Sequence, residues 1–283
     1  MQEAGKVVIT SANCATAGLL IPRLRQKGYY TTGLIRRPAA VGTDAVVTDW
    51  MHSEAAKKAM AEADHIIHLS GDANAGNNHQ YKDSNYNTTK LVADCVRGGG
   101  CRRVIYLSYA HAATSQENLY LHYKGHAEHL LQQTGKEAVI FRCPVIVDAP
   151  GQPSRMDELF LSKKGRPVPV IGNGRQKMRP VYRGDVVSAI LSALVSGRSG
   201  VYELSGPEEM TIDDFIRLAN QDPSVRIRHI PAWLAKILGH AVPALSPTFV
   251  DLMLYHTQSV YNPETYEEFG LVPSPISALF SSP

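Results

Sequence analysis

Short apolar segments alternate with helical patterns along the first half of the chain. Segments such as Lys6–Thr10 and His65–Leu69 are rich in β-branched residues, and stretches such as Ala15–Gln26 have the apolar spacing of a helix. Strands and helices in alternation build βαβ units, whose parallel strands join one sheet with helices on both faces. The sequence therefore predicts an α/β fold with a doubly wound parallel sheet.

The expected elements are assigned one by one from the same patterns. Strands are predicted at Lys6–Thr10, Thr31–Ile35, Ala45–Thr48, His65–Leu69, Val104–Ser108, Ala138–Arg142 and Val201–Leu204. Helices are predicted at Ala15–Gln26, Ser53–Glu62, Lys82–Arg97, Leu119–Gln133, Gly184–Val195 and Ile212–Ala219. Ser53 and Thr211 are expected N-caps, and glycines 98–100 are expected to end a helix in left-handed backbone angles.

The turn after the first strand bears most directly on a ligand. In a G-x-x-G-x-x-G turn the glycines would fall at Ser11, Cys14 and Ala17. Glycine there permits unusual backbone angles, close approach to a diphosphate and tight packing of helix on strand. Ala17 suits the third place, whereas the other two add side chains where phosphate should lie. We therefore expect either a diphosphate held by helix-start N–H groups or a lost site, with these candidate residues: Ser11, Asn13, Cys14, Ala15 and Thr16.

Cys14 itself allows two interpretations. A thiol at a helix N-terminus can be reactive because its thiolate is stabilised there. A small packed thiol is the interpretation that we favour.

An arginine pair follows the second predicted strand. Dinucleotide-binding proteins that select NAD carry an acidic residue near this point, roughly twenty residues after the turn. In this chain Arg36 and Arg37 occur there. Guanidinium groups suit the 2′-phosphate of NADP through charge-assisted hydrogen bonds. The pair therefore favours NADP(H), and a solvated surface pair is the alternative interpretation.

Composition argues against several classes of protein. The 283-residue chain has a net charge of +3 with scattered basic residues, and no apolar run approaches the ~20 residues of a membrane-spanning helix. We therefore expect neither nucleic acid nor membrane as a partner. The four cysteines show no C-x-x-C spacing, and the amino terminus lacks the layout of a signal peptide. These features predict a cytoplasmic protein with free thiols.

Three polar residues suggest acid–base chemistry. Ser108 ends a predicted strand, and Tyr120 and Lys124 stand in a Y-x-x-x-K spacing at the start of the next helix. Residues four apart share a helical face, so phenol and ammonium should converge. A nearby ammonium lowers a tyrosine pKa and makes it a usable general acid, and the serine could hydrogen-bond a substrate oxygen. A chance spacing with a tyrosine that only packs is the alternative.

Several segments, in order, resemble the extended and atypical short-chain dehydrogenases/reductases, including NmrA-like and NAD-dependent epimerase-like members. DHIIHLSG (64–71) resembles the fourth strand and cofactor-lining loop, NYNTT (85–89) the N-x-x-x-T helix, and FRCPVI (141–146) the strand and turn beside the nicotinamide. RPVYRGDVVSAIL (179–191) and VYELSGPEEMTIDDF (201–215) resemble a later helix and strand. The resemblance spans residues 6–220.

This resemblance implies a Rossmann-like fold with a catalytic trio of Ser108, Tyr120 and Lys124. In that family the tyrosine transfers a proton, the serine orients the substrate oxygen, and the lysine also holds the nicotinamide ribose. By position, Asp49 would contact the adenine, with an exposed turn residue or N-cap as the alternative. The remaining implied cofactor contacts are Leu69, Ser70, Gly71, Lys124, Pro144 and Val145.

Beyond the predicted sheet the α/β alternation is lost. Residues 150–178 form few long apolar faces, and the chain from Ile227 onward is rich in proline, leucine and aromatic residues. We expect a dinucleotide-binding domain at residues 1–149, to which residues 179–206 return, and a small substrate-binding lobe from residues 150–178 and 207–283. If apolar residues of this lobe such as Trp233 and Phe249 face the cleft, the substrate is largely apolar, as in polyketide- or terpenoid-like molecules of secondary metabolism.

The leading hypothesis is an NADP(H)-dependent oxidoreductase acting on a carbonyl/alcohol pair of a small apolar metabolite. The missing glycines leave open a non-redox cyclase, isomerase or lyase that uses Tyr120 and Lys124, and a non-catalytic NADP(H) sensor. A monomer or homodimer is expected. A helical stripe of three histidines (122, 126 and 129) lacks acidic or cysteine partners, so no metal site is expected, and His68 and His111 are interpreted as satisfied structural histidines.

Overall fold

A seven-stranded parallel sheet forms the centre of the protein. The computed structural model describes residues 4–151, 157–241, 246–254 and 259–281. The strand order is β11-β6-β5-β4-β1-β2-β3, and every neighbouring pair is parallel. The strands are β1 (Lys6–Thr10), β2 (Tyr30–Leu34), β3 (Ala45–Val47), β4 (His65–His68), β5 (Arg103–Tyr109), β6 (Glu137–Cys143) and β11 (Gly200–Glu203). This order confirms the predicted doubly wound, Rossmann-like fold.

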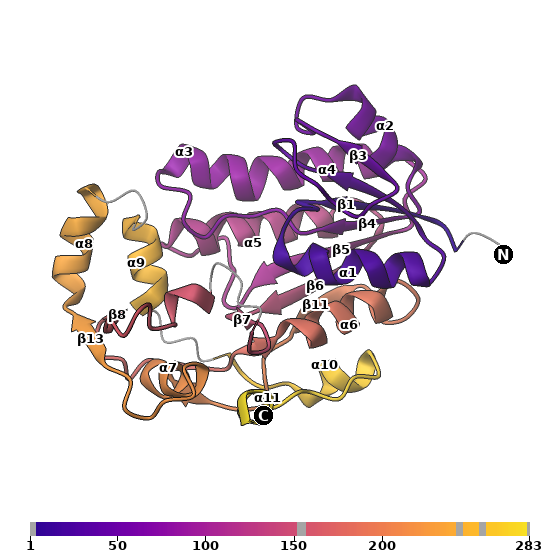
Figure 1. The fold of residues 1–283 in the computed structure, drawn as a ribbon. Coiled ribbons are helices and arrows are strands. Elements are labelled where there is room, and N and C mark those ends of the chain that lie inside the picture. The colour runs from indigo at the N-terminus through magenta and orange to yellow at the C-terminus, as the bar shows by residue number, and fades with distance from the viewer. Residues whose placement is uncertain (1–3, 152–156, 242–245, 255–258, 282–283) are drawn as a thin grey trace.

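Helices cover both faces of this sheet and bury an apolar core on each (Figure 1). On one face lie α1 (Ala15–Gln26), α6 (Arg183–Ala193) and α10 (Pro263–Glu268), and on the other lie α2 (Glu54–Glu62), α4 (Thr88–Arg97) and α5 (Leu119–Gln132). The sheet strands are apolar on both sides because each face packs against helices. The helices and strands predicted from the sequence lie within three residues of these bounds, except at Lys82.

Of the three helix ends predicted from capping residues, the structure confirms two and contradicts one. Ser53 Oγ accepts the amide of Ala56, and Thr211 Oγ1 accepts the amide of Asp214, so both predicted N-caps are confirmed. Gly98 ends α4 with a φ of −96°, so the predicted left-handed cap is wrong. The next residue, Gly99, packs too closely against α2 for a side chain, because a Cβ there would lie 2.7 Å from the Ala61 carbonyl oxygen.

The helix predicted from Lys82 is longer and less regular than expected. It begins as α3 (Asn78–Tyr81), passes through a π-helical turn, η1 (Lys82–Asn87), and continues as α4. A π turn holds one more residue than an α turn, and such turns are frequent at functional sites. In this protein the wide turn contains Asn85, which is fully buried.

Three short strand pairs and several helices form a smaller lobe beyond the carboxyl ends of β5 and β6 (Figure 1). The pairs are β7 (Ile146–Val147) with β10 (Val181–Tyr182), β9 (Lys177–Met178) with β12 (Met210–Thr211), and β8 (Val168–Ile171) with β13 (Ile227–Ile230). The helices are η2 (Asp157–Leu159), α7 (Ile212–Ala219), α8 (Ala232–Ala241), α9 (Pro247–Leu254) and α11 (Ile276–Ser281). Phe160, Phe215 and Ile216 belong to a separate apolar core of this lobe. No helix in the described ranges is both long and apolar enough to cross a bilayer.

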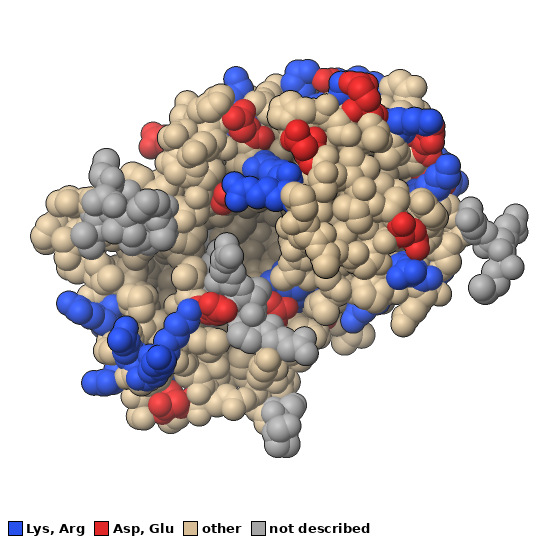
Figure 2. Space-filling view, turned by 45° about the horizontal axis from the view of Figure 1, so that its top comes forward, with Lys and Arg blue, Asp and Glu red and all other residues tan. Residues whose placement is uncertain are grey.

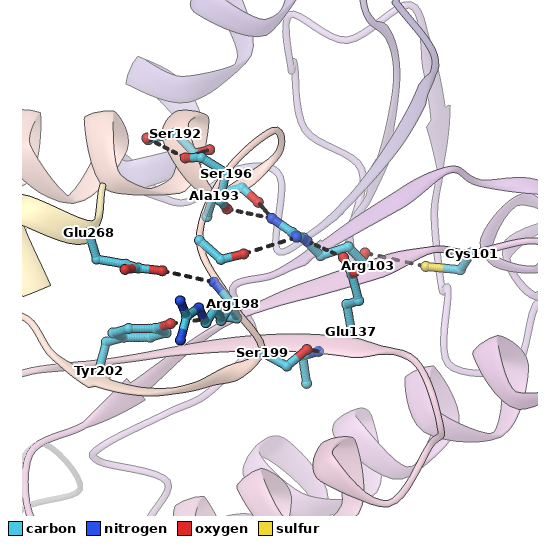
Figure 3. A network of polar contacts seen from close by, with 12 residues as sticks. Cys101, Arg103, Glu137, Ser192, Ala193, Ser196, Arg198, Ser199, Tyr202 and Glu268 are labelled. Atoms are coloured by element: carbon cyan, nitrogen blue, oxygen red, sulfur yellow. Dashed lines mark hydrogen bonds and ion pairs between the residues drawn. The ribbon is translucent and has the colours of Figure 1, made fainter. Parts of the chain in front are cut away.

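Arg103, at the start of β5, fastens the end of α6 to the sheet (Figure 3). Its guanidinium donates to the carbonyls of Ala193, Ser196 and Gly197 at 2.6, 2.5 and 3.1 Å. Glu137 of β6 accepts from its Nε at 2.7 Å. The carbonyls that a helix end leaves unpaired therefore receive a charged donor.

Candidate active and cofactor site

The carboxyl ends of β1 and β4 lie at the point where the chain changes direction across the sheet. From β1 the chain builds outward to β3, whereas β4 begins the series on the other side. Ligands of open α/β sheets bind in the crevice at such a point. Thr10 of β1 pairs with His68 of β4, and just beyond them Ser11 Oγ and Ser70 Oγ are 3.0 Å apart. Two hydroxyl groups thus bridge the mouth of this crevice.

Ser11 keeps the backbone angle that a glycine would supply in the turn after β1. Its φ of +51° lies in the left-handed region, which costs a non-glycine residue roughly 1 kcal/mol. Cys14 has an ordinary φ of −82° and caps α1, with its Sγ accepting the amide of Ala17 at 3.4 Å. The side chains at both expected glycine positions are therefore held by local hydrogen bonds. Asn13 and Ala15 are exposed.

Burial raises the pKa of the Cys14 thiol, and the nearby Arg183 guanidinium offsets this only in part. This favours the packed-thiol interpretation over a reactive cysteine. Arg183, which the sequence analysis did not single out, donates to Thr16 Oγ1 at 2.8 Å and to Asp148 Oδ1 at 2.6 Å. Asp148 balances the buried charge of this arginine, so the attraction of a diphosphate here comes from the N-terminus of α1.

A buried chain of hydrogen bonds joins β1, β4 and α4 through His68. Thr10 Oγ1 is 2.8 Å from His68 Nδ1, and Thr89 Oγ1 is 2.9 Å from Nε2. Thr10 Oγ1 accepts the amides of Leu69 and Ser70, whereas Thr89 Oγ1 donates to the Asn85 carbonyl. Thr10 must therefore donate to Nδ1, and the ring carries its proton on Nε2. Burial, with the charge of Lys124 nearby, lowers the pKa of His68 to about 3, and the histidine has the structural role that was expected.

Asn85 fixes the loop that follows β4. Its Oδ1 accepts the amide of Asp72 at 3.1 Å, and its Nδ2 donates to the carbonyls of Asp72 and Tyr81. A Cβ on Gly71 would lie 2.8 Å from Lys124 Nζ and 3.0 Å from Asn85 Oδ1. The loop backbone, the amide of Asn85 and the amine of Lys124 therefore meet at one place.

Lys124 is 3% exposed, and its Nζ donates to the Leu107 carbonyl at 2.8 Å. The same nitrogen lies 4.6 Å from the centre of the Tyr106 ring and 5.8 Å from that of Tyr120. Burial lowers the pKa of Lys124 to about 7. The amine is therefore partly neutral at neutral pH and can take up or release a proton there.

Tyr120 lies at the start of α5 beneath the smaller lobe. Its side chain belongs to an apolar cluster with Tyr81, Phe249 and Leu252, and its ring meets that of Tyr109 edge to face at 5.4 Å. No described residue is hydrogen-bonded to its hydroxyl. Burial raises the pKa of Tyr120, so the expected lowering by an adjacent ammonium is wrong for this conformation. Loss of water outweighs the attraction of an amine that is itself partly neutral.

Ser108 makes a different contact from the one expected. Its hydroxyl donates to Glu128 Oε1 on α5 at 2.5 Å, and Arg142 of β6 holds the same carboxylate through Nη2 at 2.7 Å. The next residue, Tyr109, lies against Tyr120 instead. Glu128 follows Lys124 by one helical turn and Arg142 pairs with Ser108 across the sheet, which brings both side chains beside the serine.

The space beside this tyrosine pair is small and apolar. A cavity of 20 Å³ is lined by Tyr109, Val145, Phe160, Gln176, Lys177, Met178, Ile212, Leu252 and Met253. That volume holds one water molecule at most. This cavity therefore has no room for a metabolite while Leu252 and Met253 of α9 keep these positions.

The remaining predicted cofactor residues lie at the surface or in the packing of the smaller lobe. Arg36 and Arg37 are exposed after β2, and no described carboxylate forms an ion pair with either. Figure 2 shows a hollow between the two parts of the molecule with basic side chains on its rim. Asp49 lies in an exposed turn, 3.0 Å from the ring of His52. Pro144 is buried, and the Val145 carbonyl accepts the amide of Val181.

The described residues contain no group of three or more His, Cys, Asp or Glu side chains arranged to hold a metal ion. Two histidines of the stripe on α5, His122 and His126, pack ring against ring at 4.5 Å.

Comparisons with known proteins place this geometry in context. The family model described as the NAD dependent epimerase/dehydratase family matches residues 8–204. NADH dehydrogenase (ubiquinone) 1 alpha subcomplex subunit 9, mitochondrial, of Arabidopsis thaliana is 31% identical over 166 residues, which are 57% of this chain and 41% of that protein. The uncharacterized protein y4nL of Sinorhizobium fredii is 25% identical over 232 residues, 73% of this chain and 65% of that one. The chain spans less than two thirds of the length of each relative.

Solved structures share the fold over almost the whole chain. The complex of MoeE5 with UDP-glucuronic acid and NAD has a TM-score of 0.76 at 16% identity, covering 97% of this chain and 96% of that one. UDP-glucuronic acid 4-epimerase from Bacillus cereus in complex with NAD has a TM-score of 0.72 at 15% identity with the same coverage. At such identities the likeness establishes the fold alone.

Proposed function

Because the chain belongs to the NAD dependent epimerase/dehydratase family, we propose that it binds NADP(H) between β1 and β4 and interconverts the carbonyl and alcohol forms of a small, largely apolar metabolite. One observation carries the proposal. Lys124 Nζ, the loop after β4 and Asn85 Oδ1 meet at the carboxyl edge of the sheet. Among the described residues, this amine has one hydrogen bond, to the Leu107 carbonyl, so it has donors left for ribose hydroxyls.

The residues around the crevice fit a dinucleotide. The Ser11 side chain is held by a hydrogen bond with Ser70, and that of Cys14 by the Ala17 amide. Arg183, paired with Asp148, places guanidinium N–H groups beside the N-terminus of α1, where the diphosphate would lie. Arg36 and Arg37, exposed after β2, suit a 2′-phosphate. These contacts replace part of what glycines supply in other dinucleotide turns.

NADP(H), when bound, supplies or accepts the hydride. The Tyr120 hydroxyl then gives or takes the proton of the substrate oxygen, and Lys124, with a pKa of about 7, holds or passes on that proton. Tyr109 orients the substrate oxygen, because the Ser108 hydroxyl is committed to Glu128. Burial raises the pKa of Tyr109 to about 12, so its hydroxyl stays a donor. The apolar side chains clustered with Tyr120, among them Phe249 and Leu252, favour an apolar substrate.

Calorimetric titration with NADPH and NADH tests the cofactor site. The wild type should bind NADPH more tightly, and a double Arg36→Ser, Arg37→Ser variant should lose about tenfold of that preference, as two charged hydrogen bonds allow. Arg97→Ser, at an exposed position on α4, is the matched control. Failure of both nucleotides to bind the wild type would reject the proposal.

Turnover tests the assignment of Tyr120. With NADPH and a panel of apolar aldehydes and ketones, absorbance of the reduced nicotinamide should fall, and Tyr120→Phe should slow this at least about 100-fold while binding NADPH as before. A Tyr120→Phe variant with full activity would remove this residue from the chemistry.

A second candidate function is an NADP(H)-binding protein without turnover. The closed 20 Å³ cavity and the raised pKa of Tyr120 favour it, and one curated relative carries the name of a subunit of a larger enzyme. Tight NADPH binding with no turnover across the panel, in wild type and Tyr120→Phe alike, would select this candidate over the first.

A further inference from the structure

Unpaired basic side chains gather on the smaller lobe. Lys164 and Arg166 lie in the turn before β8, and Arg226 and Arg228 lie at the start of β13. All four are exposed, and no described carboxylate forms an ion pair with any of them. Figure 2 shows a group of Lys and Arg side chains at the lower left, away from the central hollow.

Backbone pairing holds these charges together although about sixty residues separate them in the sequence. The Val168 amide donates to the Arg226 carbonyl at 2.8 Å, and Arg226 Nη2 donates to the Gly165 carbonyl at 2.7 Å. Alternate strand residues share a face, so Arg226 and Arg228 lie on one face of β13. His229 lies on the other face, where it contacts Asp213 of α7 at 3.1 Å. The two arginines therefore face away from the core of the lobe.

The helix that follows β13 adds two exposed apolar side chains. Trp233 and Ile237 of α8 are 65% and 61% exposed, and their spacing of four places them on one helical face. Ala235, at 1% exposed, marks the buried face, and Lys236 is paired with Asp251 of α9 at 2.7 Å. Figure 1 places α8 and β13 together at the end of the molecule farthest from β3.

We propose that this end of the lobe binds the surface of a bilayer that contains anionic lipids. We call it the distal surface and define it by Lys164, Arg166, Arg226, Arg228, Trp233 and Ile237. Each basic residue near an anionic membrane contributes about 1 kcal/mol. Tryptophan is favoured at the level of the lipid headgroups, and an exposed apolar neighbour adds buried area there. Charge complementarity and these two apolar side chains together fit a lipid surface better than a purely ionic partner.

The proposal departs from the expectation drawn from composition, that no membrane partner exists. That expectation rested on a net charge of +3 and on the absence of a basic run. In the folded protein, however, the pairing of β8 with β13 brings together basic residues that are distant in the sequence. Binding would be peripheral and sensitive to salt.

Vesicle sedimentation at low salt tests the distal surface. The wild type should bind vesicles of phosphatidylcholine with about 30 mol% phosphatidylglycerol and not pure phosphatidylcholine, because the main attraction is ionic. A double Arg226→Glu, Arg228→Glu variant should bind at least about tenfold more weakly. The control is Lys57→Glu with Lys58→Glu, an equal charge change on α2, which should bind as the wild type does.

Tryptophan emission supplies a second readout from the same samples. The chain has two tryptophans, Trp50 at 1% exposed and Trp233 at 65% exposed. Anionic vesicles should shift the emission of the wild type to shorter wavelength, and a Trp233→Ala variant should show no shift. Thermal denaturation of the charge-reversed variant, with a midpoint expected to match that of the wild type, confirms that it is folded.

Three outcomes would overturn the proposal. One is failure of the wild type to bind anionic vesicles at low salt, and another is binding by the charge-reversed variant that equals binding by the control. Binding of a single-stranded oligonucleotide without vesicle binding would assign the distal surface to nucleic acid instead. None of these outcomes depends on the nucleotide site, so they test the distal surface independently of the proposed function.

Discussion

At the scale of single residues, burial decides the protonation of the site. Burial raises the pKa of Tyr120 and lowers that of Lys124 to about 7, so both side chains favour their neutral forms. The Y-x-x-x-K spacing alone suggested a charged lysine beside an acidic phenol. A ligand that brings polar groups into the crevice would restore part of the lost solvation and draw both pKa values back toward their ordinary range.

Lys124→Met should stabilise the protein, and most strongly at pH 7 and below. The pKa of Lys124 falls from its ordinary 10.5 to about 7 on folding, so the unfolded chain binds more protons between these values and stability rises with pH there. Methionine removes this cost, so the gain in unfolding free energy should be about 1–3 kcal/mol at pH 7 and should shrink toward pH 10. Urea denaturation at several pH values measures it.

Lys58→Met on α2, where the side chain is 76% exposed, is the control for that series and should change stability little at any pH. An equal gain for Lys124→Met at pH 7 and pH 10 would show that the buried amine keeps its ordinary pKa.

Ser108→Ala should destabilise the fold without changing the affinity for NADPH. Its hydroxyl donates to the buried Glu128 carboxylate, and losing such a bond costs about 1–2 kcal/mol. Thermal denaturation and nucleotide titration measure the two effects, with the exposed Ser115→Ala as control. A large loss of turnover at unchanged stability would return Ser108 to the catalytic trio and remove Tyr109 from it.

At the scale of elements, the sequence predicts most of the fold because apolar periodicity and capping residues act locally. The seven strands of the central sheet and the N-caps Ser53 and Thr211 were identified in this way, whereas the short strands of the smaller lobe were not. The π turn at Lys82–Asn87 was not, because one added residue in a turn barely changes the helical pattern. The contact of Ser108 with Glu128 was also missed, since a strand-end position does not tell which partner a hydroxyl finds across the layers.

Arg103→Met should lower the unfolding free energy by about 3 kcal/mol, because three carbonyls at the end of α6 lose one charged donor. Denaturant unfolding measures the change, and Arg102→Met, whose side chain is 66% exposed, should cost less than about 1 kcal/mol. A loss for Arg103→Met as small as that of Arg102→Met would show that water satisfies these carbonyls equally well.

At the scale of the whole molecule, α9 links the smaller lobe to the sheet-bearing part and closes over Tyr120. The Tyr81 hydroxyl donates to the Ala73 carbonyl and lies 2.7 Å from Ser246 Oγ, which caps the start of α9 by accepting the Phe249 amide. Asn118 of the segment before α5 donates to the Thr248 carbonyl. A few polar bonds thus hold α9 against the sheet-bearing part of the protein.

Tyr81→Phe should loosen α9 selectively. The variant loses the hydrogen bonds of the hydroxyl to the Ala73 carbonyl and to Ser246 Oγ. The bond to Ser246 holds the start of α9, and its loss, worth about 1 kcal/mol, should speed hydrogen exchange of the α9 amides about fivefold relative to those of α1. Tyr202→Phe, whose hydroxyl donates to the Arg198 carbonyl, should leave this ratio unchanged. Equal acceleration in α1 and α9 would mean that the variant weakens the whole fold and that α9 does not open on its own.

The crystal structure of the protein with NADPH tests the central claim most directly. The nicotinamide ribose should lie within hydrogen-bonding distance of Lys124 Nζ, the diphosphate should lie between the turn at Ser11 and Arg183, and the 2′-phosphate should contact Arg36 or Arg37. A nucleotide bound elsewhere, or no nucleotide at millimolar NADPH, would contradict the account.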